Sequence, residues 1–373
     1  MKIILSIDGL SYKNLDLSIM PNIKKLIEES MYIKKVNTIF PSVTWKIHSV
    51  VSTGEVDCGV VGNQFINNEG VLKNYWDDDV LNQVLTKSTF YDSFFLEGLK
   101  VASICWPLTQ GSNSIKYNIP EFYSQEEFDR SCTTLFFEEL LQANIPVNQY
   151  GRYSTVDDLV ILQDELTNQI IEYIITNKDV DVIMGHYLSI DTFEHCFGVD
   201  SKEVKFAMKF IDGQIGKIIQ KLKAMNLYDQ SQILIFSDHG QVNIEETIDL
   251  PKELKKANLD SFVRFCDDGG AIHFYSDECN EKLEQFIKSA SYFISYKNVD
   301  PKNNNGLIFI ASFKKGYVTS DYGSHHPFGA THGYDPKYVD EMNTFALYKG
   351  SSKGVIEEMK IQDLIELLES KGK

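Results

Sequence analysis

Short runs of apolar residues alternate along the chain with longer segments in which apolar residues recur every three or four positions. Several of the short runs are apolar throughout, which is typical of strands buried on both faces of a largely parallel sheet. We expect strands of this kind at residues 2–7, 32–39, 100–105, 180–186, 232–236 and 344–348.

The longer segments have the periodicity of amphipathic helices. The first of them begins after Met20 with a proline, which suits the first turn of a helix. We expect helices at residues 21–29, 159–176, 204–225 and 355–370. Strands and helices that alternate in this way predict an α/β fold with a doubly wound, largely parallel sheet.

Two stretches interrupt the alternation. Residues 110–155 mix aromatic, proline and polar residues, and we interpret them as a short lid. Residues 243–324 have the pattern of a small α+β unit, with expected strands at 271–275 and 307–311 and an expected helix at 281–291. The sequence therefore predicts a core formed by residues 1–242 and 325–373, and an inserted α+β cap at 243–324 that covers the polar motifs described below.

Composition and charge narrow the classes of partner. The chain has 373 residues, of which 43% are hydrophobic and 24% charged, and these are ordinary values for a globular protein. A net charge of −17 disfavours a nucleic-acid polymer or an anionic membrane as partner. A small anionic substrate stays possible, because bound divalent cations invert the local field. Only three arginines accompany 33 lysines, so a guanidinium clamp on phosphate is not expected.

The apolar run near the N-terminus is too short for a signal peptide, and no stretch approaches the roughly 20 apolar residues of a membrane span. The cysteines show no Cys-x-x-Cys spacing, and they are Cys58, Cys105, Cys132, Cys196, Cys266 and Cys279. We therefore expect reduced thiols and a cytoplasmic protein.

Candidate metal ligands follow two of the expected strands. Asp8 ends the first strand and precedes Gly9, and Asp238-His239 ends the strand at 232–236. In open α/β sheets ligands bind outside the carboxyl ends of the strands, so these side chains lie where a site is expected. Asp8 alone could equally cap a turn, whereas two adjacent potential ligands after a buried strand favour metal binding.

Further candidates lie at helix positions. Asp191 and His195 have the i, i+4 spacing that places two side chains on one helix face, although a surface pair would look the same. Thr44 precedes a segment with a helical apolar face and a stop at Gly54. A threonine at a helix N-terminus is a normal cap, but it could also be a nucleophile in a place that favours negative charge.

The last candidates lie in loops. His332 stands before Gly333, which would allow a close approach to a metal, and Asn63 in a Gly-Asn turn could donate to a phosphate oxygen. His325 and His326 are suited to substrate contact, and we interpret His48, His186 and His273 as structural. Three aspartates, three histidines and one threonine hydroxyl suffice to hold two divalent metals around an oxygen nucleophile, which points to phosphoryl transfer.

The order of these motifs is similar to that of a known family. The landmarks are Ser6-Ile7-Asp8-Gly9, Met20-Pro21-Asn22-Ile23, Phe40-Pro41-Ser42-Val43-Thr44, Gly62-Asn63, Asp191-x-x-x-His195, Phe236-Ser237-Asp238-His239-Gly240 and His332-Gly333-Tyr334-Asp335. With them the chain resembles the type I phosphodiesterase/nucleotide pyrophosphatase family of the alkaline phosphatase superfamily.

The resemblance implies a two-metal hydrolase of small phosphate esters. One metal would be held by Asp8, Thr44, Asp238 and His239. The other would be held by Asp191, His195 and His332. The metals of the family are usually zinc, and manganese is an alternative. Thr44 would attack phosphorus and form a covalent ester, and Asn63 with a backbone N–H near Thr44 would stabilise the phosphoryl oxygens.

The substrate is less closely implied. Nucleotide-cleaving members commonly have Lys-Thr-Phe-Pro-Asn around the nucleophile, whereas this chain has Val43-Thr44-Trp45-Lys46-Ile47. Metal chemistry is therefore expected, with nucleotides as one possible substrate class. Two alternatives remain: a phosphonoacetate hydrolase, in which a lysine (46, 73, 116 or 314) would bind the substrate carboxylate, and a noncatalytic metal-binding relative.

Overall fold

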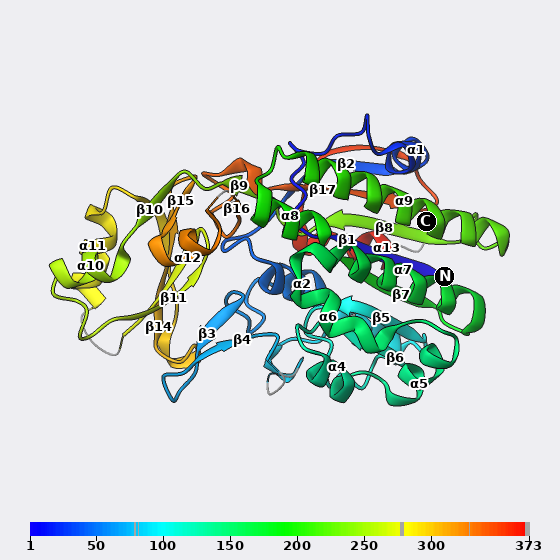
Figure 1. Ribbon diagram of the computed structural model, residues 1–373, viewed down its shortest axis with the longest axis horizontal. Helices are drawn as coiled ribbons and strands as arrows, with labels where there is room; N and C mark the ends of the chain where they lie inside the picture. Colours follow the sequence, from blue (N-terminus) through cyan, green and yellow to red (C-terminus); the bar gives the residue numbers. More distant parts are fainter. Residues whose placement is uncertain (78–79, 81, 277–279, 328, 370–373) are drawn as a thin grey trace.

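An eight-stranded sheet forms the centre of the larger part of the molecule (Figure 1). The computed structural model describes residues 1–77, 80, 82–276, 280–327 and 329–369. In spatial order the strands are β18 (Gly354–Lys360), β2 (Met31–Asn37), β17 (Thr344–Lys349), β8 (Gln232–Ser237), β1 (Lys2–Ile7), β7 (Val182–Tyr187), β5 (Val101–Trp106) and β6 (Tyr117–Pro120). Neighbouring strands are parallel except at β17, which is antiparallel to both β2 and β8.

Helices cover both faces of this sheet, as the alternation of apolar strands and amphipathic helices predicts. Along β1, Ile3 and Leu5 belong to one hydrophobic core and Ile4 to the other. The first core is closed by helices α1 (Pro21–Glu29), α7 (Val160–Asn177) and α9 (Lys202–Ala224). The second is closed by α2 (Thr44–Thr53) and α3 (Phe90–Leu96). The predicted doubly wound, largely parallel α/β fold is confirmed.

The helix predicted at residues 355–370 is wrong. This segment instead begins with strand β18, which pairs in parallel with β2, so that Val355 lies opposite Tyr32. A 3-10 turn (Ile361–Asp363) and the short helix α13 (Glu366–Glu369) follow, and position 370 lies outside the described residues. Without β18 the strand β2 would be an edge strand with unpaired N–H and C=O groups. The hydrogen bonds between β18 and β2 therefore outweigh the helical pattern of the local sequence.

The segment at 110–155 contains β6 and three helices, α4 (Gln125–Ser131), α5 (Thr134–Gln142) and α6 (Tyr150–Thr155). Its apolar side chains, among them Phe128 and Phe136, are buried in the same core as α7. Most of the segment therefore packs beside the main sheet, and its last residues reach the cavity described below.

A smaller antiparallel sheet lies beside the carboxyl ends of the main-sheet strands (Figure 1). Its order is β11 (Arg264–Asp268), β12 (Ala271–Tyr275), β14 (Leu307–Phe313) and β13 (Phe293–Asn298). Helices α10 (Leu250–Lys256) and α11 (Asn280–Ser289) contribute to its core, in which Ile272, Phe274 and Phe313 are buried. The pattern predicted β12, β14 and α11 at nearly these bounds, and β11 and β13 were not predicted.

Three pairs of short strands and one further helix connect the two sheets. The pairs are β3 (Gln64–Ile66) with β4 (Leu72–Asn74), β9 (Val242–Asn243) with β16 (Ala330–Thr331), and β10 (Glu246–Ile248) with β15 (Tyr317–Thr319). Helix α12 (Ser320–His325) follows β15 directly. These connections place the segments around residues 63 and 332 beside the carboxyl edge of the main sheet.

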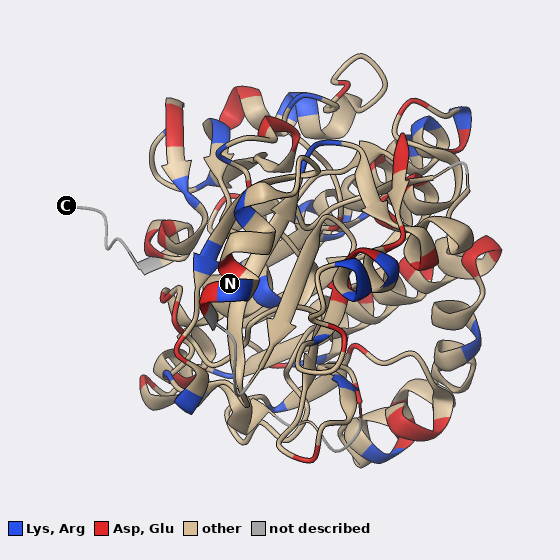
Figure 2. Cartoon of the chain, turned by 90° about the vertical axis from the view of Figure 1, so that its left-hand side faces the viewer, with Lys and Arg blue, Asp and Glu red and all other residues tan. Residues whose placement is uncertain are grey.

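Acidic and basic residues are interspersed along the chain in the view of Figure 2, where they are coloured red and blue on the ribbon. Within the described residues, no helix combines the length and the apolar composition needed to cross a bilayer. Free thiols are present at the five described cysteines, and Cys279 lies outside the described residues.

A carboxylate from another helix satisfies the N-terminus of α1. Met20, at the N-cap position, makes no side-chain cap. Asp212 of α9 accepts instead, from the backbone N–H of Asn22 at 3.1 Å and from that of Ile23 at 2.8 Å. Asp212 is only 2% exposed, so water cannot replace it.

Replacing Asp212 by alanine should lower the free energy of unfolding by about 2–4 kcal/mol, because two backbone donors lose a charged, buried acceptor. Urea denaturation of the purified variant measures this loss. Lys209→Ala on the exposed face of the same helix is the matched control and should change stability by less than about 0.5 kcal/mol. Equal losses in both variants would contradict the cap.

Candidate metal centre

Acidic side chains follow three neighbouring strands of the main sheet. Asp238 follows β8, Asp8 follows β1, and helix α8 (Ser189–Phe197), which begins shortly after β7, carries Asp191. Because these strands are parallel neighbours, their carboxyl ends lie at one edge of the sheet. Asp8 is 4% exposed and Asp238 fully buried, so the fold places carboxylates at this edge away from water.

Asp8, Asp238, His239 and Thr44 form one cluster. His239 Nε2 lies 3.4 Å from Asp8 Oδ1 and 3.5 Å from Asp238 Oδ2. The Thr44 hydroxyl is hydrogen-bonded to the same nitrogen at 3.0 Å. The structure thus brings together the four residues that the resemblance assigned to one metal.

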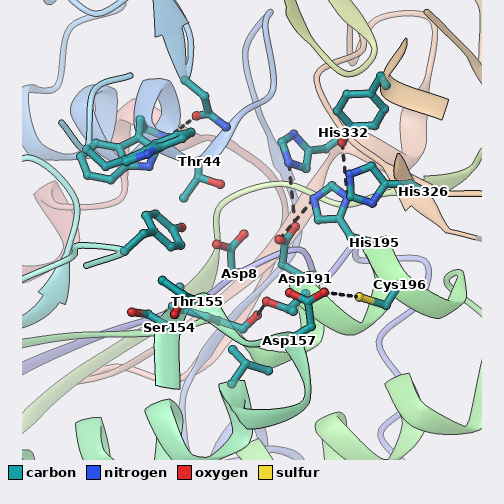
Figure 3. Close-up of a pocket in the computed structure, with 18 residues that line it drawn as sticks. Asp8, Thr44, Ser154, Thr155, Asp157, Asp191, His195, Cys196, His326 and His332 are labelled. Carbon is teal, nitrogen blue, oxygen red and sulfur yellow. Dashed lines mark hydrogen bonds and ion pairs between the residues drawn. The ribbon is translucent and has the colours of Figure 1, made fainter. Parts of the chain in front are cut away.

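Asp191, His195 and His332 form a second cluster. Asp191 lies 3.4 Å from His195 Nε2 through one oxygen and 4.0 Å from His332 Nε2 through the other. The rings of His332 and His239 are 4.1 Å apart between centroids, which joins the two clusters. Figure 3 shows Thr44, Asp8 and Asp191 directed into the same space as His195 and His332.

Thr44 is the first residue of α2, at the end of the helix that favours negative charge. Val43 occupies the N-cap position in an extended conformation, and no side chain caps the helix. The Thr44 hydroxyl therefore faces His239 instead of serving as a cap, which was the alternative interpretation. The predicted helix stop is also present, since Gly54 has φ 72° and donates its N–H to Val50 O at 2.8 Å.

Asn63 lies beside this helix start. Its side-chain Oδ1 accepts the backbone N–H of Trp45 at 2.9 Å, and its own N–H donates to Asp268 at 3.0 Å. The Trp45 N–H is thus already used within the protein, and the amide NH₂ group of Asn63 is the end of this side chain that remains to donate.

Burial and mutual repulsion dominate the electrostatics of the site. Burial raises the pKa of Asp8 well above its usual range, and the charges of Asp191 and Glu121 raise it further. Burial likewise raises the pKa of Asp238, with Asp8 as the next cause. Burial lowers the pKa of His239 and of His332 well below the usual value. The side chains around Asp8 and Asp238 therefore supply too little positive charge to keep both carboxylates ionised.

The donor set fits divalent cations. Asp8 Oδ1, Asp238 Oδ2, His239 Nδ1 and His332 Nδ1 are buried, and within the described residues no hydrogen-bond partner reaches them. Carboxylate oxygens and imidazole nitrogens are the ligands of zinc and manganese sites, and neutral imidazole is the form that binds. One ligand atom from each of Asp8, Asp238 and His239 lies within 4.8 Å of the other two, and the same holds for Asp191, His239 and His332.

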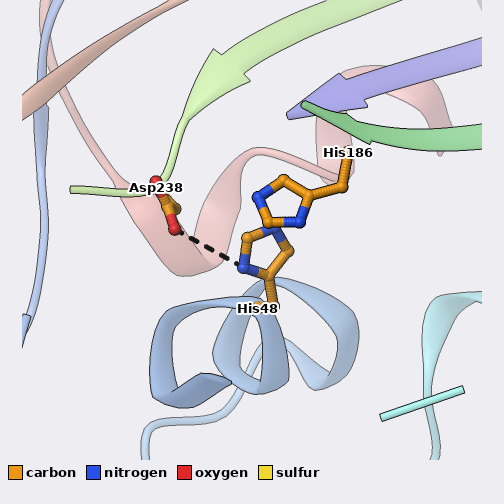
Figure 4. A group of neighbouring side chains, drawn as sticks. All are labelled: His48, His186 and Asp238. Atoms are coloured by element: carbon orange, nitrogen blue, oxygen red, sulfur yellow. Dashed lines mark ion pairs between the residues drawn. The ribbon is translucent and has the colours of Figure 1, made fainter. Parts of the chain in front are cut away.

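Two histidines interpreted as structural from the sequence lie directly against these carboxylates. His48 Nδ1 is 3.6 Å from Asp238 (Figure 4), and His186 Nε2 is 3.4 Å from Asp8. Burial alone would lower the pKa of His186, but its hydrogen bond to Glu121 and the charge of that residue raise it. The sequence held one signal for each position. His48 stands four residues after Thr44, on the same helix face, and His186 lies opposite Ser6 in the register of β1 and β7.

A cavity of about 410 Å³ opens onto the two clusters. Its wall next to Thr44 is aromatic, with the rings of Trp45 and Trp76 5.9 Å apart and those of Trp76 and Tyr123 5.3 Å apart. Other lining residues, which the sequence did not single out, come from α6, from the 3-10 turn after it and from α12, and they include Ser154, Thr155, Asp157 and Tyr322. His326 lines the cavity as suggested, whereas His325 is exposed and contacts the carbonyl oxygen of Asp321.

The fold and the site define an α/β protein with buried aspartate and histidine clusters, of the kind that holds metals, at the carboxyl edge of its sheet. The family model for type I phosphodiesterase/nucleotide pyrophosphatase matches residues 2–335. The chain therefore belongs to this family of hydrolases, as the order of its motifs predicted.

Similar proteins show how far this likeness extends. Bis(5'-adenosyl)-triphosphatase enpp4 of Mus musculus is 22% identical over 358 residues, which are 89% of this chain and 71% of that protein. Ectonucleotide pyrophosphatase/phosphodiesterase family member 5 of Homo sapiens is 24% identical over 258 residues, and this match spans only 48% of that protein. The solved murine member 5 has a TM-score of 0.72 at 17% identity, covering 98% of this chain and 93% of that one, and shares the fold.

Divalent metal should stabilise the protein, because only the folded state brings the carboxylates together. We expect zinc or manganese at 100 times its dissociation constant to add about 2.7 kcal/mol to the free energy of unfolding. Thermal unfolding with and without metal measures the shift, with EDTA as the reversal. Asp238→Asn should remove most of the shift, and His325→Ala, at an exposed position outside both clusters, should keep it. An equal shift in Asp238→Asn would contradict the assignment.

Proposed function

We propose that this protein hydrolyses phosphodiester or pyrophosphate bonds in small molecules, with Thr44 as nucleophile and two divalent metal ions, most plausibly zinc, as cofactors. One observation carries the proposal: the Thr44 hydroxyl stands at the start of α2 within 3.0 Å of His239, beside two clusters of metal-ligand type. Membership of a hydrolase family supports the reaction class.

Seven residues would hold the metals. Asp8, Thr44, Asp238 and His239 suit one ion, and Asp191, His195 and His332 suit the other. When bound, the two cations lower the pKa of the threonine hydroxyl and neutralise charge on the phosphoryl oxygens. His186 lies behind Asp8 and orients it, a role that residues behind metal ligands commonly have. The ring nitrogens of His48 are hydrogen-bonded to Thr44 O at 2.9 Å and to Ser6 Oγ at 3.0 Å.

Thr44 is placed to form and release a covalent ester. Its Oγ forms a bond to phosphorus as the bond from phosphorus to the leaving oxygen breaks, and its hydroxyl proton is released. Water then attacks the phosphothreonine, which frees the second product and restores the hydroxyl. In the transition state the NH₂ group of Asn63 donates to a phosphoryl oxygen, since its carbonyl end is held by Trp45.

The charge of the cavity argues for a diester. No lysine or arginine is among the described residues that line it, and Asp157 adds a further carboxylate. A substrate with a second anionic group would find no cationic side chain there, so of the two proposed bond types the singly charged phosphodiester fits the cavity better than the pyrophosphate. Lys46, the candidate nearest to Thr44, donates to the carbonyl oxygens of Val56 and Val60, away from the cavity. These observations disfavour a phosphonoacetate hydrolase and a monoester phosphatase.

Nucleotide-like diesters suit the aromatic wall. Trp45, Trp76 and Tyr123 offer ring faces and edges next to Thr44, where a planar group of the substrate can stack. An inactive threonine-to-alanine variant of murine ectonucleotide pyrophosphatase/phosphodiesterase 5 has been solved in complex with AMP, and its fold matches this chain with a TM-score of 0.71. We therefore propose nucleoside monophosphate esters as the first substrates to test.

Replacing Thr44 by alanine should lower kcat for a diester at least about 10³-fold, because the covalent route is lost. Thr44→Ser, which keeps a hydroxyl, should retain measurable turnover, and both variants should unfold at about the wild-type temperature. Steady-state kinetics with the p-nitrophenyl ester of thymidine 5'-monophosphate measures the effect. Unchanged hydrolysis by Thr44→Ala would remove Thr44 from its role.

The wild-type protein loaded with zinc or manganese should hydrolyse bis-p-nitrophenyl phosphate faster than p-nitrophenyl phosphate, because the monoester carries a second negative charge. EDTA should abolish both activities. A preference for the monoester would contradict the charge argument, and release of acetate from phosphonoacetate would favour the C–P hydrolase. A fully loaded protein that hydrolyses none of the three would favour a noncatalytic metal-binding relative.

A further inference from the structure

A buried pair of titratable residues in the small sheet has no part in the chemistry described so far. Asp268 ends β11 and His273 lies in β12, and their side chains share one face because Cys266 pairs with His273 two residues before Asp268. His273 Nε2 is 3.1 Å from Asp268 Oδ2, with the side chains 0% and 2% exposed. Burying a carboxylate beside an imidazole costs desolvation free energy, which hydrogen bonds to the carboxylate must offset.

The residue that this carboxylate contacts outside its own sheet is Asn63. Asp268 Oδ2 accepts the Asn63 backbone N–H at 3.0 Å. Gly62 lies against the pair so closely that an added Cβ would be 2.0 Å from Asp268 Oδ2 and 2.6 Å from His273 Cε1. The turn at 62–63 therefore rests directly on Asp268 and His273, and glycine permits that approach.

Asn63 is consequently held at two points. Asp268 fixes its backbone, and the Trp45 N–H next to Thr44 fixes its side-chain oxygen. The small sheet makes a second contact with the site through the turn between β11 and β12. Gly270 in this turn donates its N–H to the carbonyl oxygen of His332 at 2.7 Å. The small sheet thus contacts both Asn63 and a candidate metal ligand.

We propose that Asp268, supported by His273, is a positioning residue for Asn63. It sets the distance between the Asn63 amide and the phosphoryl group attached at Thr44, and through it the inserted sheet determines how well the transition state is stabilised. This inference rests on the proposed function, because it concerns the same reaction at the same site.

The first test is the kinetics of Asp268→Ala with the p-nitrophenyl ester of thymidine 5'-monophosphate. We expect kcat to fall about 10- to 100-fold with KM and metal content near wild type, because a misplaced donor weakens contacts made in the transition state. Asp268→Asn, whose amide oxygen can still accept the Asn63 N–H, should recover most of the loss.

Asp267→Asn is the matched control. Asp267 precedes Asp268 on the same strand, but it accepts from the Gly269 N–H and the Thr319 hydroxyl, and within the described part of the chain it makes no hydrogen bond with Asn63. It should leave kcat within about threefold of wild type even if stability falls. If the strand had a purely structural role, kcat would fall by a similar factor in Asp268→Ala and Asp267→Asn, and that result would overturn the inference.

A double-mutant cycle separates positioning from an independent effect. In an Asn63→Ala background Asp268→Ala should cause no further loss of kcat, because the residue through which it acts is gone. Additive losses would overturn the inference. If Asp268→Ala does not fold, Asp268→Leu, which has a similar volume and no hydrogen-bond acceptor, takes its place in both backgrounds. Full activity of Thr44→Ala would refute the proposed function instead, whatever the Asp268 variants do.

Discussion

The burial of several carboxylates at one edge of the main sheet is the constraint on which the site depends. Burial raises the pKa of Asp8, Asp191 and Asp238, and neighbouring carboxylates raise it further, so these groups oppose one another's ionisation. Positive charge has to come from His186, whose pKa is raised, and from cations, because burial lowers the pKa of His48 well below its usual value. The carboxylates can lie this close together because the chain after β1 packs against the backbone of Asp191. A Cβ on Gly9 would lie only 2.8 Å from that backbone. The glycine after the first strand is therefore part of the charge arrangement as well as of the turn.

Much of the sheet and of the candidate ligand set was predictable from local pattern. Each buried strand shows as an apolar run, and Asp8 and Asp238 come directly after such runs, so the geometry of parallel strands predicts that they meet. The segment after residue 354 was mispredicted because its pairing partner, β2, lies more than 300 residues away in the sequence. The same long-range dependence hid His186, whose place beside Asp8 follows from strand register. The aromatic wall and Asp157 come from a helix start, two loops and a 3-10 turn that are far apart in the sequence, so tertiary packing alone brings these side chains together.

The site is shared between two structural layers with different tasks. The main sheet supplies the proposed nucleophile and most candidate ligands from positions that follow its strands and begin its helices. The small sheet contributes contacts that hold the loops around residues 63 and 332. The solved murine relative shares this fold at 17% identity.

The antiparallel strand β17 has a consequence for the order in which the chain can fold during synthesis. It lies between β2 and β8, although it is made more than 100 residues after β8. Until it leaves the ribosome, β2 has no place in the sheet and β8 is an open edge. Between the synthesis of β8 and that of β17 the nascent chain therefore carries two unpaired strand edges, a state prone to wrong pairing and to capture by chaperones. The segment around Thr44, which follows β2, can settle against His239 only when the last central strand closes the gap.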